Sequence, residues 1–192
     1  TYDLKIWGEQ ENLKRKFCSG NGSINPKIIN KYIYTINDFL SNFKNPNVVD
    51  FGCGDFNVGS QIRHLCNNYY ALDIVQELID ENKKIFAGKK VEFLCKDITK
   101  DNLPTGDIGF VRQVLQHLSN KSIHDFLLNI KNKYKYLVLT EHLPISKFKP
   151  NYDIASGPDN RTVFNSGVIL HEPPFNLKYN KFTSLLKVPA TP

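Results

Sequence analysis

The sequence predicts an α/β protein with a doubly wound, mostly parallel sheet and an irregular C-terminal arm. Short apolar runs with strand character alternate with amphipathic stretches of helical length between residues 26 and 143. Two glycines one residue apart, Gly52 and Gly54, follow the first of these runs. Because strands that alternate with helices of this length pair in parallel, we expect helices on both faces of the sheet.

The first predicted elements are a helix, a strand, a helix and a second strand. Apolar side chains recur at helical spacing over residues 26–44, which predicts an amphipathic helix. The run NVVDFG at 47–52 predicts a buried strand, and 58–66 the helix after the glycine loop. A second strand at 68–75 ends near Asp73, and the polar stretch QELIDENKKIFA continues as a helix.

Three further strands complete the predicted sheet. VEFLCKDI at 91–98 is the third strand, and DIGFVRQVL at 107–115 is the fourth and leads to a helix at 122–133. The fifth, at 135–143, has the most strand-like content of Val, Leu and Tyr. After it, Pro, Asn, Gly and Ser punctuate an irregular arm that ends in one late strand, FTSLLKV at 182–188.

The length predicts one domain. A chain of 192 residues with 41% apolar residues can fill one core and is short for two. We divide it into an N-terminal helical cap at 1–46, a core at 47–143 that holds the five main strands and an irregular arm at 144–192 that ends in the late strand. The net charge of +6 suits an anionic partner, but the lysines are spread along the chain and do not decide the function.

The four cysteines indicate a reducing compartment. Cys18, Cys53, Cys66 and Cys95 form no CxxC pair and no Cys/His spacing for a metal, so we expect neither a zinc site nor a disulfide framework. No apolar run approaches the ~20 residues that span a bilayer. We therefore expect a soluble, cytoplasmic protein without a membrane partner. The sequence contains no Met, even at position 1, which suggests that a short leader precedes it.

The glycine loop carries an acid where a phosphate-binding loop would not. Gly52 and Gly54 fit the first two positions of GxGxxG, but Asn57 stands at the third. A pyrophosphate on a helix N-terminus would meet the negative charge of Asp55. S-adenosylmethionine has no phosphate and carries an ammonium group and a sulfonium, so it fits this loop better than NAD. Asp73, at the end of the second strand, then stands where a carboxylate binds ribose hydroxyls.

Five segments in order resemble the motifs of class I S-adenosylmethionine-dependent methyltransferases. They are VVDFGCGDF, ALDIV, CKDI, DIGFVRQVLQHLSN and YLVLTEH, and they span about residues 45–143. The resemblance implies S-adenosylmethionine as cofactor and S-adenosylhomocysteine as product. It implies a site made of Asp50, Gly52, Cys53, Gly54, Asp55, Asp73, Ile74, Asp97, Ile98, Arg112, Gln113 and Val114. In this set the glycines line the methionine end, Asp73 and Ile74 lie at ribose and adenine, Asp97 and Ile98 lie at adenine, and residues 112–114 face the methyl group.

Simpler structural roles stand beside several of these assignments. Asp50 could cap the loop amides, Asp73 could be a helix N-cap, and Asp97 could belong to an ordinary turn. Cys53 could serve packing alone. The place of Asp73 directly after the second strand favours the ribose role.

Four polar residues are candidates for the transfer chemistry. His117 follows the fourth strand, and Glu141 and His142 follow the fifth, so their side chains could reach the same edge of the sheet. A histidine is the usual base for a hydroxyl acceptor because its pKa lies near neutrality. Arg161, in the arm, offers a planar fork for a phosphate or carboxylate on the acceptor. His117 and Arg161 could equally be packing or surface residues, whereas the end of the fifth strand favours a site role for Glu141 and His142.

The sequence favours an enzyme that methylates a small acceptor, most simply at oxygen. Similar small bacterial enzymes accompany sugar and surface-polysaccharide biosynthesis, which suggests a sugar-like or phosphorylated acceptor. A nucleic-acid methyltransferase is the first alternative, but RQVL occupies the place of the (D/N/S)PP(Y/F) motif, and the similar EPPF lies at 172–175. A non-catalytic cofactor-binding protein is the second alternative. The sequence leaves the oligomeric state open.

Overall fold

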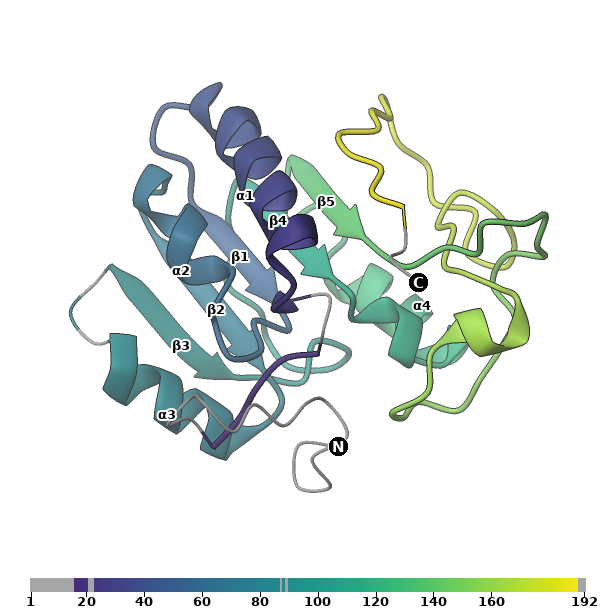
Figure 1. Ribbon diagram of the computed structural model, residues 1–192, viewed down its shortest axis with the longest axis horizontal. Helices are drawn as coiled ribbons and strands as arrows, with labels where there is room; N and C mark the ends of the chain where they lie inside the picture. Colours follow the sequence, from purple (N-terminus) through teal and green to yellow (C-terminus); the bar gives the residue numbers. More distant parts are fainter. Residues whose placement is uncertain (1–15, 21–22, 87, 89, 190–192) are drawn as a thin grey trace.

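The computed structural model describes residues 16–20, 23–86, 88 and 90–189 (Figure 1). Within them the chain forms one five-stranded sheet, and all four strand pairs are parallel. No helix of these described residues is long and apolar enough to cross a membrane. The division at residues 46 and 143 stays a prediction.

The sheet order is β3-β2-β1-β4-β5. The strands are β1 (Val48–Phe51), β2 (Tyr69–Asp73), β3 (Val91–Cys95), β4 (Ile108–Arg112) and β5 (Tyr136–Thr140). The order runs outward from β1 in one direction to β3 and in the other to β5, which is the doubly wound arrangement that the alternating pattern predicted. The five strands predicted between residues 47 and 143 are confirmed, each with at least one end that differs by one to three residues.

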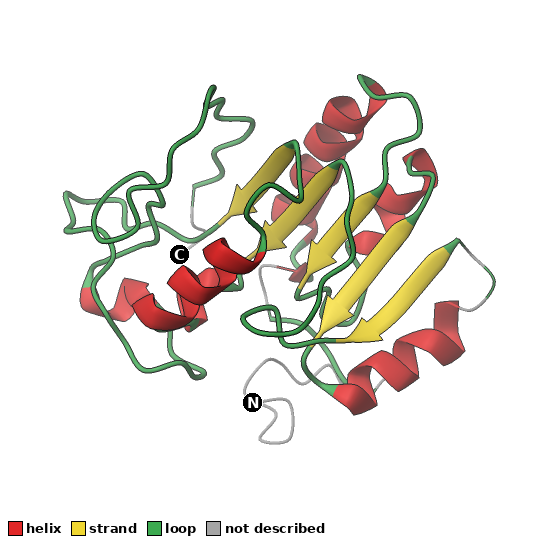
Figure 2. Ribbon diagram, turned by 180° about the vertical axis from the view of Figure 1, so that it is seen from behind, coloured by secondary structure: helices red, strands yellow, loops and turns green. Residues whose placement is uncertain are grey.

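Helices cover both faces of this sheet (Figures 1 and 2). One face carries α1 (Pro26–Ser41), α2 (Gly59–Ile62) and α3 (Gln76–Phe86), and the other carries α4 (Asn120–Asn129). Short 3₁₀ turns are η2 (Arg63–Leu65), η3 (Leu115–His117) and η4 (Arg161–Phe164). The predicted helix at 58–66 is therefore split into α2 and η2, and the one at 122–133 begins and ends earlier.

Neighbouring side chains of each strand enter two separate cores. Val48 and Phe110 pack with α1, whereas Val49 and Val111 pack on the opposite face with α4. This follows from the period of two in a strand, which sends successive side chains to opposite faces of the sheet. Both faces are apolar because both are covered, as expected for a parallel sheet.

The late strand expected at 182–188 does not form, since these residues are coil. Phe182 is 67% exposed, and Leu185 and Leu186 are also exposed. The segment has strand-like composition, but a strand needs an edge to pair with, and in this structure it does not pair with β5. The N-terminal aromatic residues Tyr2 and Trp7 lie outside the described residues.

Candidate functional site

The candidate site lies at the carboxyl edge of the sheet, where the strand order reverses between β1 and β4 (Figure 2). Ligands of doubly wound proteins bind in the crevice at such a switch point. The loops that meet here follow β1, β2, β3, β4 and β5 and carry nearly all of the residues that the sequence pointed to.

The glycine loop after β1 is held in a conformation that favours glycine. Gly52 and Gly54 have φ values of 79° and 55°, in the left-handed region that L side chains rarely adopt. Space is a second reason at Gly52, because an added Cβ would lie 2.5 Å from Cγ2 of Val114. The segment after β4 thus packs directly against the glycine loop through the side chain of Val114.

Asp73 is fixed at the end of β2 by backbone donors. Its Oδ2 accepts a hydrogen bond from the Gly54 N–H at 3.1 Å, and its Oδ1 accepts one from the Val75 N–H at 3.1 Å. Burial raises the pKa of this carboxyl, and these two donors lower it in part. Each oxygen keeps a further lone pair that can accept from a hydroxyl. The side chain is 8% exposed and is held in one orientation at the switch point.

The Asp55 carboxylate binds the N-terminal segment. Its Oδ2 accepts from the Ser19 N–H at 2.9 Å, and its own N–H donates to Ser19 Oγ at 3.2 Å. Its Oδ1 accepts from the Asn57 N–H at 3.1 Å. The sequence argument placed this acid beside a cationic ligand. In the structure its carboxylate instead ties residues 16–20 to the glycine loop.

Asp50 and Arg112 belong to a buried cluster under α1. The Tyr69 hydroxyl donates to Asp50 Oδ2 at 2.9 Å, and burial raises the pKa of Asp50 to about 6. The Arg112 guanidinium lies 4.9 Å from the centre of the Tyr32 ring and donates to Ser23 Oγ at 2.6 Å. Asp50 is thus bonded to β2, and Arg112 is bonded to Ser23 before α1, so both predicted side chains contact protein groups.

The remaining predicted cofactor residues divide into exposed and packed ones. Ile74 is 65% exposed beside Asp73 and offers an apolar surface there. Ile98 is buried in the core under α4, so its side chain packs inside the protein. Asp97 accepts from the N–H and the Oγ1 of Thr99 and pairs with Lys100, which is the turn role that the sequence left open. Cys53 is half-buried, and burial raises its thiol pKa well above the usual range.

A polar network joins the ends of β4 and β5. Glu141 accepts from the N–H groups of Leu115 and Gln116, at 3.0 and 3.2 Å, and burial raises its pKa to about 8. The amide of Gln116 lies 3.1 Å from His117 Nε2 and accepts from the His142 N–H at 3.2 Å. Glu141 and Gln116 thus bind the two chain segments to each other.

The two histidines of this network differ in access. His117 is half-buried, and its Nδ1 lies 3.1 Å from the Asp159 carbonyl while its Nε2 meets Gln116. His142 is exposed, and its Nε2 lies 2.9 Å from Nε2 of Gln113. Burial lowers the pKa of His142, and the charge of Arg112 lowers it further. Gln113 has a φ of 56°, which for a residue with a Cβ is uncommon and is typical of constrained site residues.

Arg161 is not at an open site. It is 0% exposed, and its guanidinium donates to the carbonyls of Tyr152 and Leu115 at 2.9 and 2.8 Å and to Asn120 Oδ1 at 2.9 Å. These bonds fasten the arm to η3 and to the first residue of α4. A guanidinium with this burial does not present a fork to an anionic acceptor, and its part in the structure is to anchor the arm.

Sequence reasoning missed two buried amides, Gln116 and Asn82. Asn82 donates from α3 to the Gly54 carbonyl at 2.8 Å. It occupies the buried side of α3 with Leu78 and Ile79, at positions four and three residues before it. A polar residue in the apolar stripe of an amphipathic helix was the signal that could have found it.

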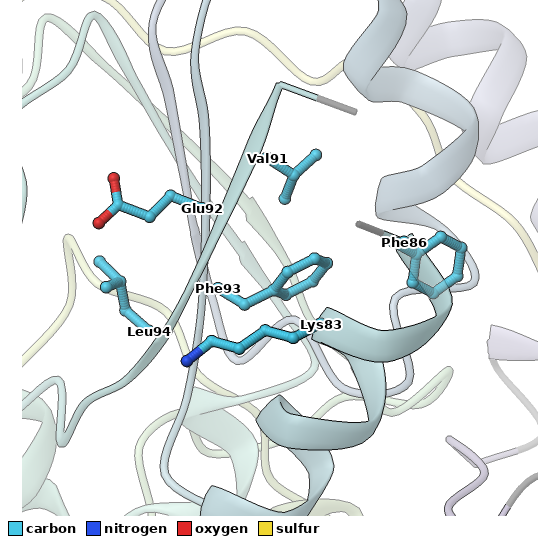
Figure 3. A pocket seen from close by; sticks show the side chains of 6 residues that line it. All are labelled: Lys83, Phe86, Val91, Glu92, Phe93 and Leu94. Atoms are coloured by element: carbon cyan, nitrogen blue, oxygen red, sulfur yellow. The ribbon is translucent and has the colours of Figure 1, made fainter. Parts of the chain in front are cut away.

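An open pocket of about 410 Å³ lies elsewhere, at the outer edge of the sheet (Figure 3). It is lined by Lys83, Phe86, Val91, Glu92, Phe93 and Leu94. None of these six residues belongs to the loops at the switch point. The candidate site therefore rests on the convergence of loop residues and not on this pocket.

Comparisons with known proteins point to one family. Residues 49–135 match a family model described as "Methyltransferase domain". Phosphoethanolamine N-methyltransferase 3 of Arabidopsis thaliana is 27% identical over 92 residues, which are 45% of this chain and 19% of that protein. The chain thus spans about a fifth of the curated relative.

Solved structures share the fold at low identity. N-methyltransferase NodS of Bradyrhizobium japonicum WM9 in complex with S-adenosyl-l-homocysteine superposes with a TM-score of 0.59 at 13% identity and covers 74% of this chain and 71% of its own. The magnesium protoporphyrin IX methyltransferase ChlM of Synechocystis PCC 6803 with bound SAM gives 0.54 at 14% identity, over 82% and 74%. A Leishmania major SAM-dependent methyltransferase gives 0.54 at 15% identity over 62% of this chain, which spans about half, 52%, of that structure. The predicted fold class is confirmed.

Proposed function

We propose that the protein methylates a small acceptor with S-adenosylmethionine as cofactor, because residues 49–135 match a methyltransferase domain model and the chain shares the fold of solved methyltransferases. The observation that carries the proposal is the fixed carboxylate of Asp73 beside the left-handed glycine loop at the switch point. Both its oxygens are oriented by backbone donors, and their remaining lone pairs suit the two hydroxyls of a ribose.

The residues present fit the cofactor. Asp73 would hold the ribose, the exposed side chain of Ile74 would pack on the adenine, and the backbone of residues 52–54 would approach the methionine end. When bound, S-adenosylmethionine supplies a methyl group activated by its sulfonium. Since Asp55 points to Ser19, the loop would approach the cofactor through backbone groups, and an acid at this position still disfavours a pyrophosphate.

The pair of half-buried Gln113 and exposed His142 supports transfer to oxygen. The lowered pKa of His142 keeps its imidazole neutral at pH 7, as a base for a hydroxyl needs. A hydroxyl of the acceptor would take the place of the Gln113 amide at His142 Nε2, and its proton would pass to that nitrogen. His117 and Glu141 would hold this segment in place, because both already bind protein groups.

The acceptor class is a finer part of the proposal. A sugar-like or phosphorylated acceptor of surface-polysaccharide biosynthesis is supported by the resemblance to small bacterial enzymes and by the net charge of +6. The buried Arg161 adds no support to an anionic acceptor. Transfer to nitrogen is the second candidate, because the curated relative is named a phosphoethanolamine N-methyltransferase. An amine that arrives unprotonated would need no base.

Calorimetric titration tests the proposal. The protein is titrated with S-adenosylmethionine, S-adenosylhomocysteine and NAD, and the titrations are repeated with Asp73→Ala. We expect binding of both sulfur compounds, no binding of NAD and a loss of roughly 30-fold or more in the variant, since two charge-assisted hydrogen bonds to the ribose are removed. The exposed Asp38→Ala is the matched control and should bind as the wild type. Binding of NAD alone would overturn the proposal.

A further inference from the structure

A single amide side chain on the buried side of α3 contacts the glycine loop. Asn82 is 0% exposed, as are its neighbours Leu78 and Ile79 on the same side of the helix. A buried amide among apolar residues costs free energy unless it is hydrogen-bonded. Its Nδ2 donates to the carbonyl of Gly54 at 2.8 Å, so the loop supplies the partner.

Gly54 is held on both sides by side chains from different elements. Its N–H donates to Asp73 Oδ2 at 3.1 Å, and its carbonyl accepts from Asn82. The same peptide plane that contains the Gly54 carbonyl contains the Asp55 N–H, which donates to Ser19 Oγ at 3.2 Å. One amide from α3 therefore fixes a peptide plane that connects β2, the loop and the N-terminal segment.

We infer that Asn82 is a positioning residue for cofactor binding, which acts by holding the Gly54 peptide so that Asp73 keeps its orientation. This inference rests on the proposed function, because it takes Asp73 as the ribose ligand. Gly54 has no Cβ and a φ of 55°, so its own backbone imposes little resistance to rotation. Without the Asn82 amide the buried carbonyl loses its short hydrogen bond and keeps the weak thiol donor of Cys53, whose Sγ lies at 3.6 Å, so rotation of the peptide toward water becomes more favourable.

Rotation of this peptide would reach the cofactor site through Asp73. The N–H of Gly54 is one of three backbone donors to the Asp73 carboxylate, and Val75 and Ile74 supply the others. With the Gly54 donor displaced, the carboxylate is held less firmly and spends less time in the orientation that two ribose hydroxyls need. Affinity for the cofactor would fall even though Asn82 does not touch it.

The test is calorimetric titration of S-adenosylhomocysteine into wild type, Asn82→Ala and Asn82→Ser, with Ile79→Val as the matched control. Ile79 is equally buried on α3, and loss of one methylene there destabilises the fold without removing a bond to Gly54. We expect affinity about 10-fold weaker in both Asn82 variants and unchanged affinity in Ile79→Val. If Asn82→Ala does not fold, the affinity of Asn82→Ser is compared with that of wild type instead.

A double-mutant cycle with Asp73→Asn separates positioning from a merely structural role. If Asn82 acts through Asp73, Asn82→Ala should cost much less affinity for S-adenosylhomocysteine in the Asp73→Asn background than in wild type. Full additivity of the two losses, or an affinity in the Asn82 variants equal to that of wild type, would overturn the inference and leave the proposed function intact. Failure of the wild type to bind S-adenosylhomocysteine would instead overturn the proposed function, and the inference with it.

Discussion

The two halves of the carboxyl edge use their polar side chains differently. In the half formed by β1 and β2, Asp73 and Asn82 bind backbone groups of the glycine loop, where we propose that the cofactor binds. In the half formed by β4 and β5, Glu141 and Arg161 bind backbone groups of η3, and Arg161 thereby fastens the C-terminal arm. Similar hydrogen bonds thus shape the proposed ligand site in one half and anchor a chain segment in the other. A polar residue near a switch point is therefore not by itself evidence of catalysis.

Replacement of Arg161 should give the largest effect and tests the anchoring role directly. Arg161→Met removes three donors and leaves two buried carbonyls and the Asn120 oxygen without them, so we expect a loss of about 3 kcal/mol in the free energy of unfolding. Urea unfolding measures it. Lys147→Met, at an exposed position in the same arm, should change it by less than ~0.5 kcal/mol. If the Arg161→Met variant were as stable as wild type but had lost methyl transfer, the anchoring role would be wrong and a role of Arg161 in binding the acceptor would be favoured.

Replacement of His142, which is exposed in the β4–β5 half, should lower the rate of methyl transfer without changing the affinity for the cofactor. His142→Ala removes the neutral imidazole and should lower the rate of transfer to a hydroxyl acceptor by about 100-fold. Affinity for S-adenosylhomocysteine should stay within about twofold, because His142 lies beyond the β1–β2 half. Single-turnover rates and calorimetry on the same preparation measure the two quantities, with the exposed His64→Ala as control. An unchanged rate would favour an amine acceptor.

The pKa of Glu141 predicts a pH dependence of stability. Burial raises this pKa to about 8, so the folded state holds a proton that the unfolded state releases near pH 4.5. Stability from this group is therefore present below about pH 4.5 and is lost as pH rises through about 8. Glu141→Gln should remove the part of the fall in unfolding free energy that this group contributes between those limits. Chemical unfolding at several pH values is the measurement, and an equally steep fall in the variant would assign the dependence to other groups.

The smallest effect should come from the contact between the N-terminal segment and the glycine loop. Ser19→Ala removes the acceptor of the Asp55 N–H but leaves the Ser19 N–H donating to the Asp55 carboxylate. We expect a loss of about 1 kcal/mol in unfolding free energy, typical of one hydrogen bond. Ser41→Ala, at an exposed position at the end of α1, should change stability less. Equal effects of the two substitutions would argue against a special role for the Ser19 contact.

Local pattern was sufficient for the order of the elements and for the edge of the sheet at which Gly52, Gly54 and Asp73 meet. Alternating strands and helices and a Gly52–Gly54 pair after the first strand depend only on side-chain periodicity and on backbone freedom, which a sequence carries directly. The position of Asp73 at the end of the second strand follows from the same pattern, because the carboxyl ends of parallel strands share one edge.

Side-chain direction and long-range partners were decided by the tertiary structure. Asp55 was expected at the ligand, but its carboxylate meets Ser19, and Arg161 was expected at the acceptor, but its guanidinium meets η3 and Asn120. The late strand at 182–188 has the composition of a strand but does not pair with β5. In each case the deciding partner lies far along the chain, and periodicity describes only neighbours within a few residues. The sequence thus determined where the ends of the strands would meet, and packing decided which polar groups there remain open to a ligand.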